Sequence, residues 1–138
     1  MTGFLKAVAK FGKKAIEQGD RIKKHSAIDV YSLAILATPV KEGILRGNWV
    51  ATVEKPYTGI SDRPQPDPKV VINKMKVRIL TASIGDVLYL SNNVPYATVI
   101  DAGRTETSGS VLAREGMTKP AIEQWDNIVM KNARKYGN

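Results

Sequence analysis

The sequence has no cysteine and only one histidine, His25, and these two shortages exclude several kinds of site. Without cysteine the chain forms no disulfide, offers no thiolate nucleophile and holds no metal through sulfur. One imidazole cannot build a multi-histidine metal centre, and a Ser-His-Asp arrangement would have only His25 to use. His25 stands beside Lys23, Lys24 and Ser26, a setting typical of an exposed helix residue.

Motifs of the common enzyme classes are also missing. The chain contains no G-x-S-x-G turn, no G-x-x-x-x-G-K or G-x-G-x-x-G phosphate loop and no H-E-x-x-H pair. Its acidic residues are scattered, so no local pair suggests acid–base chemistry. We therefore expect a protein that is not an enzyme and uses no cofactor or metal; the alternative left open is an enzyme, for example a nuclease that uses the scattered carboxylates and a divalent ion.

Long apolar runs are absent as well. None reaches the roughly 18–20 residues of a membrane span, and the basic start of the chain is interrupted by charge every few residues, unlike a signal peptide. The expectation is a soluble, intracellular chain without a membrane partner. Its 138 residues predict a single domain that occupies residues 1–138.

Charge is the most unusual bulk property of the chain. Lys and Arg number 21 against 13 Asp and Glu, which gives a formal net charge of +8. A large basic excess attracts acidic partners, such as nucleic acid or an acidic protein surface. Seven basic and two acidic residues lie within the first 26 positions, so the excess is concentrated at the start.

That start has the periodicity of a long helix over residues 3–37. Five apolar residues repeat at helical spacing, namely Phe4, Val8, Phe11, Ala15 and Ile22. Thr38-Pro39 ends the pattern, because proline disfavours helical angles in the residue before it. A straight helix of 35 residues would be about 52 Å long, against a radius of gyration of about 14 Å for a domain of this size. The helix therefore either breaks near Gly19 or projects from the body as a basic element over residues 1–26.

The rest of the chain predicts an α+β fold: a long N-terminal helix, a small antiparallel sheet, a middle helix and a C-terminal helix. Strands are expected at 48–54 and 86–92. A helix is expected at 68–82, with Asp67 as its N-cap and with the apolar residues Val71, Met75, Val77, Ile79 and Leu80.

The remaining segments have the composition of connections. Residues 55–67 are expected to form a loop or a disordered excursion, 95–102 a short helix or a turn, and 104–116 a mobile loop. A closing helix begins near Lys119, with its buried stripe at Ala121, Trp125, Ile128, Val129 and Ala133.

The basic helix has two functional interpretations and one neutral one. Its lysines could contact nucleic-acid phosphates without sequence specificity, or they could dock on an acidic protein. In the neutral interpretation they form a solvated face that keeps the protein soluble. The candidate contact residues are Lys6, Lys10, Lys13, Lys14 and Lys24.

Two stretches are the most distinctive in the chain: residues 38–49 (TPVKEGILRGNW) and residues 91–103 (SNNVPYATVIDAG). They match the pattern T-P-V-x-x-G-x-L-R-x-x-W followed by N-x-x-P-Y-A, an acidic residue and a glycine. With a long preceding helix and a later Gly116-Met117 pair, this order resembles the neck and tail-completion proteins of long-tailed bacteriophages, the head–tail joining group that includes tail terminators.

The resemblance implies a structural role without chemistry. Proteins of this group form rings, commonly hexameric, that cap the tail tube and join it to the head connector or stopper, with DNA passing through the lumen. The implied location is the virion, and the host cytoplasm during assembly. The candidate interface and docking residues are Arg46, Asn93, Tyr96 and Arg104. For each of them the alternative is burial or local turn stabilisation within one subunit, and Trp49 is expected in the core.

Overall fold

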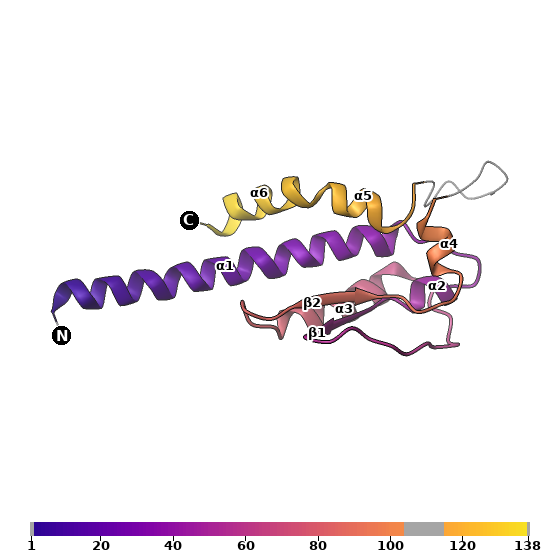
Figure 1. Ribbon diagram of the computed structural model, residues 1–138, viewed down its shortest axis with the longest axis horizontal. Helices are drawn as coiled ribbons and strands as arrows, with labels where there is room; N and C mark the ends of the chain where they lie inside the picture. Colours follow the sequence, from indigo (N-terminus) through magenta and orange to yellow (C-terminus); the bar gives the residue numbers. More distant parts are fainter. Residues whose placement is uncertain (1, 104–114, 138) are drawn as a thin grey trace.

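A single long helix runs along most of the molecule. The computed structural model describes residues 2–103 and 115–137, and in it helix α1 (Gly3–Leu36) continues through Gly19 without a break (Figure 1). Its 34 residues extend about 51 Å at 1.5 Å per residue. Every residue from 3 to 17 except Gly12 is exposed, so the N-terminal half projects from the body, as one of the two alternatives predicted.

The two ends of α1 are closed by side chains. Thr2 is the N-cap, and its hydroxyl accepts a hydrogen bond from the Leu5 N–H at 3.3 Å. At the other end the Thr38 hydroxyl donates to the Ala34 carbonyl at 2.9 Å. Pro39 follows directly, so the helix ends where the sequence predicted.

The sheet consists of two short antiparallel strands, β1 (Val50–Val53) and β2 (Leu88–Ser91). Val50 pairs with Ser91 at one end of the ladder, and Val53 pairs with Leu88 at the other. Both strands lie inside the segments predicted for them, and the α+β class with its small antiparallel sheet is confirmed.

The middle helix, α3 (Pro68–Leu80), begins as its sequence indicates. Asp67 accepts a hydrogen bond from the Lys69 N–H at 2.9 Å. Its buried residues follow a strict four-residue spacing, Val71, Met75 and Ile79. Val77 and Leu80 fall outside that row and are exposed, so the predicted apolar stripe was too wide.

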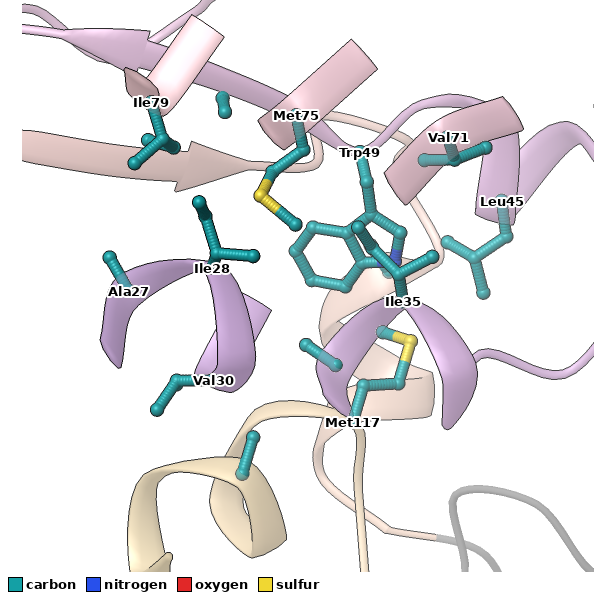
Figure 2. Packing of buried hydrophobic residues seen from close by; sticks show 14 of the residues in the cluster. Ala27, Ile28, Val30, Ile35, Leu45, Trp49, Val71, Met75, Ile79 and Met117 are labelled. Carbon is teal, nitrogen blue, oxygen red and sulfur yellow. The ribbon is translucent and has the colours of Figure 1, made fainter. Parts of the chain in front are cut away.

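The core lies around the C-terminal half of α1, which is packed between two layers (Figure 1). On one side lie α3 and the sheet, and on the other lie α5 (Thr118–Glu123) and α6 (Trp125–Tyr136). Trp49 is 7% exposed and lies in this core close to Met75 and Ile35 (Figure 2). Its predicted place in the core is confirmed.

The C-terminal helix differs from the expectation in two respects. It is interrupted at Gln124, which separates α5 from α6. Ala121 and Ile128 are buried as predicted, but Trp125 is 42% exposed and Ala133 is also exposed. Asn132 occupies the buried position instead; its amide donates to Ser26 Oγ and Asp29 Oδ2 of α1, both at 3.1 Å.

Residues 55–67 form neither helix nor strand, in agreement with the predicted loop, and they are fastened to the body. The Gln65 N–H donates to the Gly43 carbonyl at 2.9 Å, and Asn48 exchanges hydrogen bonds with the backbone of Ser61 at 2.8 and 2.9 Å. Gly43 has a φ of 93°, and a Cβ there would lie 2.5 Å from the Pro66 nitrogen. Only glycine lets the chain turn and approach this closely.

Candidate functional site

The two distinctive sequence stretches meet at one end of the molecule. Residues 38–49 contain the short helix α2 (Ile44–Gly47), and residues 91–103 contain α4 (Ala97–Asp101), which the structure shows to be a short helix rather than an irregular turn. The two helices lie at the end opposite the free tip of α1 (Figure 1). The Asn92 amide joins the stretches by donating to the Leu45 carbonyl at 2.8 Å.

Arg46 lies inside this junction. Its guanidinium donates to the carbonyls of Ile35, Leu36 and Thr38 at 3.2, 3.4 and 2.9 Å, and to the Pro66 carbonyl at 2.8 Å. The first two belong to the last turn of α1, and Thr38 follows the C-cap of that helix. The Ile35 carbonyl also accepts from the Thr38 N–H at 3.3 Å. Burial lowers the pKa of Arg46, and Asp67 partly opposes that shift, but the group stays charged at neutral pH.

The position of Arg46 corrects its predicted docking role. The side chain is 8% exposed, and its donors are engaged by carbonyls of its own chain. It therefore closes α1 and fixes residues 55–67 against it. This matches the alternative of burial within one subunit.

Thr38 and Trp49 form the second bond of the junction. The Trp49 indole N–H donates to the Thr38 hydroxyl at 2.7 Å, and that hydroxyl donates onward to Ala34. Both residues are buried, so a single hydroxyl satisfies the indole and one helix-end carbonyl. The spacing of Thr38 and Trp49 in the distinctive stretch thus has a structural reason.

Asn93 also acts within the subunit. Its side-chain amide donates to the carbonyls of Tyr57 and Gly59 at 2.8 and 3.2 Å, and the residue is half-buried. It ties the loop at 55–67 to the end of β2. These bonds match the alternative of local stabilisation within one subunit, and the docking role of Asn93 stays a prediction.

Asp101 connects α4 to the C-terminal helices. Its carboxylate accepts from the N–H groups of Met117 and Thr118 at 2.9 and 2.8 Å, and from the Thr118 hydroxyl at 2.6 Å. Burial by itself raises the pKa of Asp101, but these three hydrogen bonds outweigh it and hold that pKa below its ordinary value. Gly116 approaches so closely that a Cβ there would collide with the Asp101 carbonyl.

Tyr96 is a predicted interface residue that the described structure leaves open to a partner. It is 48% exposed and helps to line a surface pocket of about 480 Å³, together with Ile100, Leu45 and residues 39–44. Both distinctive stretches therefore contribute to the pocket. Its lining is largely apolar, with Lys41 and Glu42 as charged members.

Arg104, the fourth predicted interface residue, lies outside the described residues, as does most of the loop predicted at 104–116.

The predicted contact lysines divide into two groups. Lys6, Lys10, Lys13 and Lys14 are exposed on the projecting half of α1. Lys24 is held by its own chain, with its ammonium 3.0 Å from Asp20 Oδ2 and 3.3 Å from the Leu80 carbonyl. A free contact role for Lys24 is therefore corrected to an intrachain ion pair and hydrogen bond.

The described residues offer no cluster of three or more His, Asp or Glu that could hold a metal ion. Within residues 2–103 and 115–137, no helix is long and apolar enough to cross a membrane. His25 stacks on Tyr136, with 4.5 Å between ring centroids, and forms part of the contact between α1 and α6.

Sequence reasoning missed the polar bonds that unite these elements. Asn48 and Asn132 are both 3% exposed, yet neither has a neighbouring motif that indicates burial. The surface pocket was also missed, because its lining comes from stretches about 50 residues apart. Only their adjacency in space makes it a site.

Comparison with known proteins gives no match: no family model, curated protein or solved structure is similar to the chain.

We expect R46M to lower the free energy of unfolding by about 1–3 kcal/mol, because methionine keeps the aliphatic stem but removes the donors to the buried Thr38 carbonyl and to the Pro66 carbonyl. Urea denaturation followed by circular dichroism measures the change. R78M, on the exposed face of α3, is the matched control and should change stability by less than about 0.5 kcal/mol. Equal stability of the two variants would contradict the structural role of Arg46.

Asp101 should make stability depend on pH in the acid range. Its pKa is lower in the folded state than in the unfolded chain, where it is about 3.9, so its contribution is present above that value and is lost as pH falls through the folded-state pKa. D101A should cost about 1 kcal/mol at pH 7, as for loss of a helix cap. Urea titrations at several pH values should show the difference from wild type shrinking below about pH 4. A constant difference down to pH 2 would refute the account.

Proposed function

We propose that this chain is a structural protein of the bacteriophage neck. In this proposal it forms a ring, hexameric as is common in the group it resembles, that completes the tail tube and joins it to the head connector or stopper. DNA passes through the lumen, and the protein resides in the virion after assembly in the host cytoplasm.

The observation that carries the proposal is the adjacency of the two stretches on which the resemblance rests. They interlock through Asn92 and Leu45, and between them they line one exposed pocket that includes Tyr96. Most of the distinctive residues in the two stretches form hydrogen bonds or pack within the subunit. The pocket is therefore the part of both stretches that another subunit could contact.

The shape of the subunit also supports a ring. A closed ring of identical subunits uses heterologous contacts, in which one patch meets a different patch on the next copy. The chain has two dissimilar ends: the pocket end with α2 and α4, and the cationic tip of α1 (Figure 1).

Tyr96 provides the sharpest mutational test. Y96A should reduce head–tail joining at least tenfold in a complementation assay with a phage that lacks the gene, since exposed tyrosines are enriched among interface residues that contribute most to binding. Urea denaturation should show that Y96A is as stable as wild type, because the Tyr96 side chain is half exposed. V77A, which alters an exposed apolar residue of α3, is the control and should complement fully.

Electron microscopy decides the location independently. Labelled protein should be found at the head–tail junction of complete particles, within a ring of closed symmetry. Protein that is absent from purified particles, or found only in the capsid shell, would contradict the neck proposal whatever the behaviour of Y96A.

A second candidate function, nonspecific nucleic-acid binding, is favoured by the four exposed lysines on the projecting half of α1. If they contact phosphates, the logarithm of the DNA affinity should fall linearly with the logarithm of salt concentration, with a slope of about −0.9 per phosphate contact. Changing Lys6, Lys10, Lys13 and Lys14 to Gln should reduce that slope by about 3–4. Fluorescence anisotropy with a labelled duplex measures both, and a slope unchanged in the variant would exclude this role for the helix.

A further inference from the structure

The projecting half of α1 carries an apolar face that nothing among the described residues covers. Phe4, Ala7, Phe11 and Ala15 follow one another at intervals of three or four residues and so lie on one side of the helix. We call this surface the open face. Phe4 is 75% exposed and Phe11 is 74% exposed, which is unusual for two phenylalanines on the same side of a soluble helix.

The open face is the continuation of the face on which α6 packs. Ser26 lies three helical turns beyond Ala15 on the same side, and it is covered by Asn132 of α6. Next to the end of α6, a recess of about 230 Å³ is lined by Phe11, Ala15 and Gly137, among others. Helix α6 therefore covers one side of α1 and stops partway, and the same side continues uncovered to the N-terminus (Figure 1).

The shape of this surface favours an occupant of helical dimensions. Packed helices typically lie about 8–10 Å apart between their axes. Because α6 packs on α1 and ends where Gly137 and Phe11 line one recess, its end forms a step beside Phe11. A flat bilayer that reached Phe11 would meet that step first. A helix laid along α1 in line with α6 would bury both phenylalanines, and the small residues Ala7 and Ala15 would leave space for its side chains.

Charge decides which kind of helix fits. Lys10 and Lys14 lie one turn apart along one flank of the open face, and both are exposed. A second copy of the chain is disfavoured, since the first 26 residues carry seven basic and two acidic residues and the rest carries 14 basic and 11 acidic ones. Nucleic acid would satisfy the lysines but would leave the phenylalanines exposed.

We propose that the open face of α1 is a docking site for an amphipathic helix of an acidic partner protein, with apolar residues against Phe4 and Phe11 and carboxylates beside Lys10 and Lys14. The contact length from Phe4 to Ala15 is about 16 Å, or three turns of partner helix. This inference goes beyond the neck function, because it rests on the surfaces of α1 and α6 alone.

The test uses the full chain and three fluorescein-labelled 15-residue peptides. The probe peptide has one Leu face flanked by Glu. The first control peptide has Lys in place of Glu, and the second has the composition of the probe with its Leu residues scattered around the helix. Fluorescence anisotropy should show binding of the probe peptide alone, and the affinity should fall as salt rises.

Two double variants separate the apolar and the charged contributions. F4A/F11A should weaken binding of the probe by at least about tenfold through lost apolar contact, and the exposed helix should stay folded because alanine is the best helix former. K10E/K14E should weaken the probe to a similar extent and permit binding of the Lys-flanked control peptide. V77A is the matched control for an exposed apolar side chain and should bind as wild type does.

Several outcomes would overturn the proposal. They are failure of the probe to bind, equal binding by F4A/F11A, and binding of the probe and the Lys-flanked peptide with equal affinity. Phe-dependent sedimentation with vesicles of phosphatidylglycerol and phosphatidylcholine, or Phe-dependent binding to duplex DNA, without binding of the probe, would replace it with a lipid or nucleic-acid surface. Y96A and electron microscopy test ring assembly without peptide binding, so failure here leaves the neck proposal to those tests.

Discussion

The closure of the C-terminal end of α1 is the constraint on which the rest of the structure depends. A long helix that ends inside a protein presents carbonyls that water cannot reach, and each unpaired one is costly. The Arg46 guanidinium and the Thr38 hydroxyl together donate hydrogen bonds to the carbonyls at that end. The Trp49 indole N–H in turn donates to the Thr38 hydroxyl. Because Arg46 also holds the Pro66 carbonyl, the loop at 55–67 is positioned by the same group that closes the helix.

This arrangement makes the two ends of the molecule physically different. At one end, polar side chains from distant stretches are used up in satisfying the chain itself, and what stays exposed there is the pocket beside Tyr96. At the other end, α1 extends beyond its neighbours with lysines and phenylalanines that have no partner among the described residues. A subunit with two dissimilar, unsatisfied surfaces is suited to assembly, which agrees with the structural role proposed here.

Local signals predicted the elements well and the contacts poorly. The cap at Asp67 and the proline after Thr38 identified helix ends correctly, since both act through the adjacent backbone. The apolar row that begins at Phe4 was identified too, but helical spacing could not tell a buried row from an uncovered one. Trp125 shows the same limit, because its hydrophobicity suggested the core and yet it is exposed. Arg46 was predicted as an interface residue with burial as the alternative, and its contacts with carbonyls up to 20 residues away show that it is buried.

By itself, the sequence determined the α+β class, the order of the main helices and strands, the concentration of positive charge at the start and the lack of the usual catalytic motifs. These depend on composition and on interactions within a few residues. Only the tertiary structure decided that α1 projects instead of breaking, that Arg46 and Asn93 stabilise the subunit, and that one face of α1 is half covered by α6. The physical reason is that burial and hydrogen-bond partners come from residues far apart in the chain, and their meeting depends on how whole elements pack.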